Sequence, residues 1–274
     1  MTATRATAPT SETTGPGRLR VTQARVVGSE WTKFRSLRST VSTLLVAVAL
    51  MIGLGALFSG LTANTPGGFE PGQNAISTSL TGTFIAQLAI GVLGVLMITG
   101  EYSTGMIRSS LTVVPERLPM LWAKLVVFAV VVFLTTLPAA LAAFLAGQAL
   151  LRGHDLDASL SDPGASRAVL GAALYLTVAG MTALALGALL RNTAAAVTTF
   201  VAVFFVIPPL TNLLPTSLTD HFVQYLPSNA GAGLLGGTFG VAHPLSPWTG
   251  FAVMCACATV LIGSAAWRLR HADA

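Results

Sequence analysis

Residues 125–151 read LVVFAVVVFLTTLPAALAAFLAGQALL, an uncharged stretch longer than the roughly 20 residues that an α-helix needs to cross a bilayer. Five more uncharged stretches have spanning length, and they are residues 41–61, 76–99, 168–190, 194–214 and 248–267. The whole chain is 53% hydrophobic and 9% charged, with a mean hydropathy of +0.73. A segment in lipid must satisfy its own backbone hydrogen bonds, and stretches of this length favour helices over barrel strands. The sequence predicts an all-α, polytopic membrane protein whose transmembrane domain, residues 41–267, has six transmembrane helices.

A seventh uncharged stretch, residues 222–242, precedes the sixth span. It contains Pro227 and five glycines, Gly231, Gly233, Gly236, Gly237 and Gly240. These residues interrupt helices, although membrane proteins tolerate them where the backbone is buried in protein. We expect a re-entrant extracytoplasmic segment built from two short helices; the alternative is a continuous seventh span.

The basic residues predict the orientation of the chain. With six spans both termini lie on the same side, and of the 15 Lys and Arg residues only two, Arg152 and Arg167, fall on the opposite side from the other 13. Lys and Arg concentrate in cytoplasmic loops, so we expect a multi-pass protein of the cell (plasma) membrane with both termini cytoplasmic. The net charge of +5 then reflects topology, and no nucleic acid partner is expected, because no segment outside the spans is long enough to fold a binding domain.

The segment before the first span divides into two parts. Residues 1–20 are rich in Thr, Ala, Pro and Gly and predict a disordered cytoplasmic tail. At the other end of the chain, we expect residues 268–274 to be a second cytoplasmic tail. Residues 21–40 predict an amphipathic interfacial helix on membrane lipids, in which Val27, Trp31 and Phe34 recur at helical spacing among cations. The candidate residues of this helix are Glu30, Trp31, Lys33, Phe34 and Arg35. The alternative is an ordinary basic flank of the first span.

Sequence motifs for catalysis are missing. The chain has no phosphate-binding loop and no His-Glu-x-x-His motif, so we expect no enzyme activity and no cofactor in this chain. Cys255 and Cys257 lie two apart on one predicted helix and cannot pair, and no metal site is expected. The spans hold no ionisable residue of the kind that binds a coupling ion in a carrier. The spans do hold Gln87 and Gln148. Interhelical hydrogen bonding is the expected role of each, and substrate contact is the alternative.

A polar segment, residues 100–124, separates the second and third spans and reads GEYSTGMIRSSLTVVPERLPMLWAK. Gly105 permits a tight turn, and Pro115 and Pro119 keep the segment from joining the third span as one helix. Glu101, Tyr102, Arg108 and Arg117 supply groups that a partner surface could pair with. The alternative is that its cations only anchor lipid headgroups, the role that we expect for Lys124 at the membrane edge.

Three motifs in order carry a family resemblance. They are SEWTKFRSLRST at residues 29–40, EYSTGMIR at 101–108, and VPER at 114–117 followed by Ala123 and Lys124. With the Gly-rich segment from Leu226, they resemble the transmembrane subunits of the type-2 permease family of ATP-binding-cassette exporters, over nearly the whole chain. The resemblance implies a homodimer or a pair with a sister permease, driven by a separate cytoplasmic ATPase subunit and transporting outward.

In that family the segment after the second span couples the permease to its ATPase. Carried over, the coupling loop is residues 100–124, with Glu101, Tyr102, Gly105, Arg108 and Arg117 as contact candidates. Should this loop be only a connector, the interfacial helix around Glu30 and Lys33 is the next candidate. The apolar spans are compatible with a hydrophobic or amphipathic substrate, whose identity and binding residues stay unknown. The alternative function is a non-transporting membrane anchor or sensor that recruits a cytoplasmic partner.

Overall fold

The computed structural model describes residues 23–36, 38–65, 67–69, 74–103, 117–211, 213, 222–237 and 243–271. The secondary structure of these parts is helical, with no strand. Six segments among them are long and apolar enough to cross a membrane: Ser39–Ala63, Ala75–Gly100, Leu118–His154, Ala165–Leu190, Thr193–Thr211 and Pro247–His271. The predicted fold class, an all-α protein with six membrane-spanning helices, is confirmed.

Five long helices and several short ones make up the described chain. The long helices are α2 (Arg38–Ala63), α4 (Gly82–Ser103), α6 (Arg117–Leu151), α7 (Ala165–Leu190) and α12 (Pro247–His271), and α1 (Gln23–Ser36) precedes them. The fifth span joins α8 (Thr193–Val201), a π-helical turn η2 (Ala202–Val206) and α9 (Ile207–Thr211). The remaining elements are single turns or short helices: α3 (Ala75–Ser79), η1 (Arg152–His154), η3 (Val223–Tyr225), α11 (Pro227–Ala232) and η4 (Gly233–Leu235).

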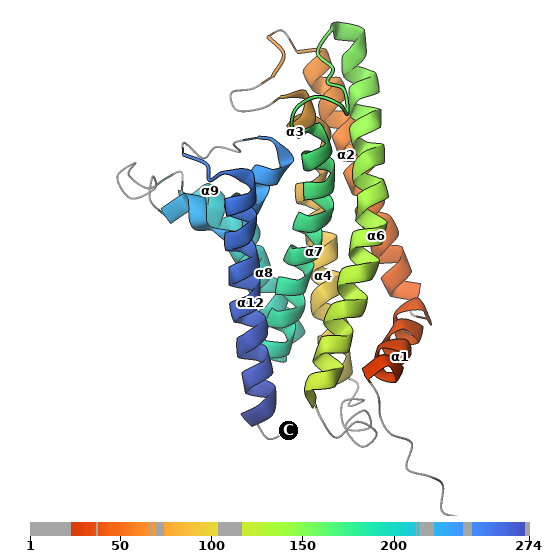
Figure 1. Ribbon diagram of the computed structural model, residues 1–274, viewed down its shortest axis with the longest axis vertical. Helices are drawn as coiled ribbons and strands as arrows, with labels where there is room; N and C mark the ends of the chain where they lie inside the picture. The colour runs from red at the N-terminus through yellow and green to blue at the C-terminus, as the bar shows by residue number, and fades with distance from the viewer. Residues whose placement is uncertain are drawn as a thin grey trace, which may run out of the picture.

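Helix α7 lies at the centre of the bundle, between α4, α6 and α12 (Figure 1). Of the most apolar part of α7, 83% is buried by the protein itself, against 17% for the fifth span. Small residues allow this enclosure. A side chain at Gly94 of α4 would collide with the carbonyl of Gly180 in α7, and one at Gly180 would collide with the ring of Phe128 in α6. The absence of side chains at these glycines is therefore what lets three helices meet.

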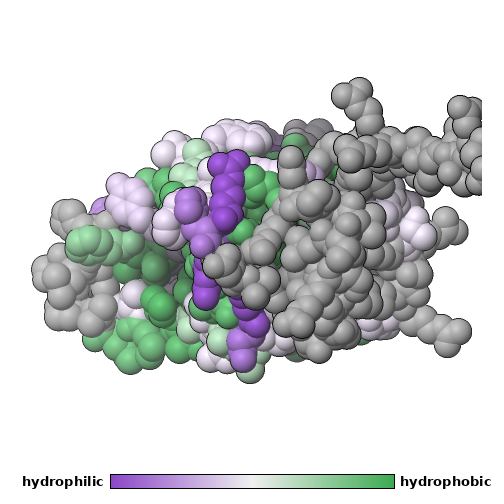
Figure 2. Space-filling model, turned by 90° about the horizontal axis from the view of Figure 1, so that it is seen from below, coloured by the Kyte–Doolittle hydropathy of each residue, from purple (hydrophilic) through white to green (hydrophobic). Residues whose placement is uncertain are grey.

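The spanning helices alternate in direction, so helix ends collect in two groups. In Figure 1, α1, the end of α4, the start of α6, the α7–α8 turn and the end of α12 all lie at the bottom, which we call the lower end. Figure 2 looks onto this end and shows a band of hydrophilic side chains bordered by hydrophobic surface. Arg191 of the α7–α8 turn and Arg268, Arg270 and His271 of the last turn of α12 belong to the lower end. Arg152 and Arg167 flank the η1 connection at the opposite, upper end.

Most helix boundaries differ by a few residues from the predicted ones; α12, for example, continues to His271, into the predicted tail 268–274. Two differences are larger. The second span was expected as one run over 76–99, but the long helix starts at Gly82, after α3 and a turn at Leu80 and Thr81. Asn74 caps α3 by accepting a hydrogen bond from the backbone amide of Ser77. Gly82 packs directly on the backbone of α2 at Leu50 and Met51, which leaves no room for a side chain. Local capping and a close helix contact thus divide a segment whose hydropathy is continuous.

The predicted loop 100–124 is also shorter than expected. Helix α4 continues to Ser103 and α6 begins at Arg117, so residues 117–124 are its first turns. Pro119 does not prevent this, because it lies in the first turn of the helix, where a backbone amide has no intrahelical acceptor. Residues 104–116, with Gly105, Arg108 and Pro115, lie outside the described residues.

The segment predicted to be re-entrant is described over residues 222–237 as η3, α11 and η4. Gly231 of α11 lies against Met254 of α12 and the ring of Tyr175 in α7, with no space for a side chain. The Nδ2 of Asn74 donates a 2.7 Å hydrogen bond to the carbonyl of Gly236. These contacts pack the segment onto α7, α12 and the start of α3, and its placement relative to a bilayer stays a prediction.

Candidate functional site

Within the described residues, two buried charged side chains join α1 to α6. Lys124 Nζ donates to Glu30 Oε2 at 2.6 Å, and the two residues are 2% and 3% exposed. A charge removed from water costs several kcal/mol unless it is paired and hydrogen-bonded, so neither side chain is compatible with burial here on its own. We call this contact the α1–α6 ion pair.

One face of α1 positions Glu30 for this contact. Val27, Glu30 and Phe34 recur at helical spacing and turn toward the bundle; Phe34 is buried and Val27 is half-buried against the core. Trp31, which the sequence placed on the same apolar face as Phe34, is 47% exposed. The inward face of α1 therefore includes an acidic residue, and Trp31 lies outside it.

On the α6 side, Lys124 lies about two turns after the helix start at Arg117, among the buried residues Leu121, Ala123 and Leu125. The expectation that Lys124 anchors lipid headgroups is wrong, because its side chain is enclosed by protein. The third spanning helix is already buried before its uncharged part begins at Leu125, because α1 covers the first turns of α6.

Most of the other sequence-predicted residues have side chains outside the described part of the chain. Glu101 and Tyr102 belong to the last turn of α4, and Arg117 is the first residue of α6, but their side chains lie outside the described residues. Gly105 and Arg108 lie outside them entirely. The interfacial candidates Lys33 and Arg35 belong to α1, and their side chains are likewise outside the described part. Among the predicted coupling and interfacial residues whose side chains are described, only Glu30 pairs with a charged residue of another helix. Its partner, Lys124, was expected to have a different role.

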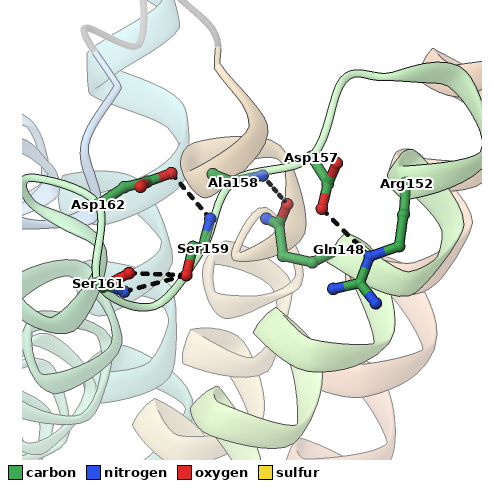
Figure 3. Close-up of polar contacts among 7 residues, drawn as sticks. All are labelled: Gln148, Arg152, Asp157, Ala158, Ser159, Ser161 and Asp162. Carbon is green, nitrogen blue, oxygen red and sulfur yellow. Dashed lines mark hydrogen bonds and ion pairs between the residues drawn. The ribbon is translucent and has the colours of Figure 1, made fainter.

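A second polar cluster closes the upper end. Gln148 of α6 donates to the carbonyl of Ala75 (3.0 Å) and to Ser79 Oγ (2.8 Å), and its Oε1 accepts from the Ala158 amide (2.7 Å). Figure 3 shows this amide contact beside the more exposed pair Arg152–Asp157. Gln148 of α6 thus holds both α3 and the connection between α6 and α7 in place by hydrogen bonds. It has the interhelical role predicted for it.

A third contact lies inside the bundle. Tyr175 of α7 donates its hydroxyl to Gln87 Oε1 of α4 at 2.6 Å, and both residues are buried. This is the interhelical hydrogen bond expected for Gln87. Within the described residues, the Gln87 amide nitrogen has no hydrogen-bond partner.

No known family model matches this sequence, and no curated protein matches it. Among the described residues, no three His, Cys, Asp or Glu side chains cluster as metal ligands would.

Proposed function

We propose that this chain is the transmembrane subunit of an ATP-binding-cassette exporter. In this proposal the protein spans the plasma membrane with its lower end in the cytoplasm, pairs with a second copy or a sister permease, and moves a hydrophobic or amphipathic substrate outward. A separate cytoplasmic ATPase subunit hydrolyses the ATP. The order of the motifs at residues 29–40, 101–108 and 114–117 supports this reading, as does a bundle of six apolar helices.

The α1–α6 ion pair is the observation that carries the proposal furthest. Helix α1 is not one of the six spans, yet a buried charge pair fixes it to α6. Helices α4 and α6 contain the two ends of residues 100–124, where the resemblance puts the ATPase contact. A displacement of this segment by a partner would reach both α6 and α1, because a buried pair resists separation. The ion pair would thus make α1 and α6 move as one unit during coupling.

Co-purification tests the proposal directly. The full chain, tagged and extracted from its native membrane under mild conditions, is expected to retain a cassette ATPase and to stimulate its ATP hydrolysis. Glu101→Ala and Arg108→Glu should weaken this association by more than tenfold if they remove desolvated pairing at the interface, at unchanged abundance of the subunit. Retention of a partner without any ATPase would instead favour a membrane anchor or sensor.

The proposed orientation has its own test. In a chain with Cys255 and Cys257 replaced by Ala, a cysteine at Ser159 should react with a membrane-impermeant thiol reagent on intact cells, because Ser159 is exposed at the upper end. A cysteine at Ser110 should react only after the membrane is opened. Labelling of Ser110 on intact cells would reverse the orientation.

A further inference from the structure

An open groove runs along α12 at the lower end of the bundle. It holds about 650 Å³, within the range of ligand pockets, and is lined by Leu189, Val260, Gly263, Ser264, Trp267 and Arg268. Leu189 comes from the end of α7, and the other residues come from the last turns of α12. Nothing lies within 4 Å of the position that a side chain at Gly263 would take, so this stretch of the groove is open.

The groove is apolar along its length and cationic at its end. Val260 and Trp267 are 68% and 65% exposed, and His271 packs its ring 4.9 Å from that of Trp267. Arg268 donates to the carbonyl of Leu189, which fixes the guanidinium at the mouth of the groove. A guanidinium has five N–H donors, so this contact leaves others for a ligand. Arg270 is exposed in the same turn.

The charged side chains that the described helices α7, α8 and α12 place around this mouth are all cationic. Helices α7, α8 and α12 contain no acidic residue, and Arg191 ends α7 beside the groove residue Leu189. Asp273 is the one acidic residue of the C-terminal tail, and it lies outside the described residues. An occupant that complements this surface has an apolar chain and a negative head.

We propose that the groove binds an anionic phospholipid, with an acyl chain along Val260 and Gly263 and the phosphate on Arg268. Three physical preferences agree with this assignment. Tryptophan settles at the membrane interface, arginine extends its head to the headgroup layer, and a guanidinium matches phosphate oxygens in bidentate geometry. The groove lies at the end of a spanning helix, where headgroups are found. The proposal is independent of transport, since it rests on α12 and the end of α7 alone.

Tryptophan quenching by brominated lipid tests the site. Trp31, Trp122 and Trp248 are replaced by Phe in the full chain, which leaves Trp267 as the only fluorophore of its kind. The protein is reconstituted into vesicles with equal fractions of brominated phosphatidylglycerol or brominated phosphatidylcholine. We expect the site to bind phosphatidylglycerol about fivefold or more tightly than phosphatidylcholine. The attraction between one cation and an anionic membrane surface corresponds to a preference of about this size.

Two variants separate the headgroup from the chain. Arg268→Gln should reduce the lipid preference to about one, whereas the matched change Arg152→Gln at the upper end should leave it unchanged. Gly263→Leu should lower quenching by both lipids, because it fills the open stretch. Equal quenching by the two lipids, or a preference that survives Arg268→Gln, would overturn the proposal. So would weak quenching that increases when the protein is diluted in lipid, which would mean that a second copy covers the groove.

Discussion

The α1–α6 ion pair should hold α1 on the bundle, and its removal should release that helix. Lys124→Met leaves Glu30 at a site where it is 3% exposed, without the ammonium group that lies 2.6 Å away. Breaking a buried pair by removing one member typically costs about 3 to 5 kcal/mol. If α1 detaches as a unit, about 3 kcal/mol raises its detached population by more than about 100-fold.

Thiol labelling can measure this population. Phe34 is 7% exposed on the inward face of α1, so Phe34→Cys, with Cys255 and Cys257 replaced by Ala, reports each detachment of the helix. Labelling in this background should be about 100-fold faster with Lys124→Met or Glu30→Gln. The double change should recover much of the protection, because it removes both charges of the pair together.

An exposed ion pair supplies the control. Asp157→Asn removes the partner of Arg152, whose side chain is 78% exposed, and such pairs contribute about 0 to 1 kcal/mol. Its labelling rate should stay within about threefold of the background. If Lys124→Met also stays within that range, the pair contributes nothing to the docking of α1.

Further expectations concern packing, the upper end and the source of energy. Gly55→Ala should destabilise the bundle by about 1 to 3 kcal/mol in detergent unfolding, because the added methyl would collide with the backbone of α3. The matched change Gly53→Ala should be neutral or slightly stabilising, because nothing lies within 4 Å of its added methyl. Gln148→Met should cost about 1 to 3 kcal/mol in the same assay, since it removes a partner of the buried Ala75 carbonyl and of the partly buried Ala158 amide. Arg152→Gln, in an exposed pair, should change stability by less than about 1 kcal/mol, and equal losses in the two variants would contradict the role assigned to Gln148. The purified subunit alone should bind no ATP in equilibrium dialysis and show no hydrolysis, because the sequence lacks a phosphate-binding loop; saturable binding would refute this.

Hydropathy was sufficient to predict the number and type of the spanning elements. Each uncharged stretch must form a complete helix in lipid, so composition and length decide the fold class with little help from tertiary contacts. The residues at which helices begin and end depend on tertiary contacts, which explains the two larger differences from the predicted boundaries. Gly82 starts α4 because it packs on α2, and α6 begins before its uncharged part because α1 shields Lys124.

The α1–α6 ion pair could have been partly anticipated. A lysine directly before a long apolar run is normally read as a headgroup anchor, and that reading holds for most such residues. The contrary signal was Glu30, an acidic residue within a segment rich in cations and placed between Val27 and Phe34 on one helical face. Their pairing could not be deduced, because it joins positions 94 residues apart and needs α1 to fold back onto α6.

The hydrogen bond between Gln87 and Tyr175 bears on how the protein is made. The two residues are 88 positions apart, so at about 5 to 20 residues per second Gln87 is synthesised roughly 4 to 18 s before its partner. During that interval α4 carries a polar amide among lipid chains, where such groups seek any available partner. We therefore expect an order-dependent step in biogenesis, in which another helix or the insertion machinery shields α4 until α7 is made and completes the centre of the bundle.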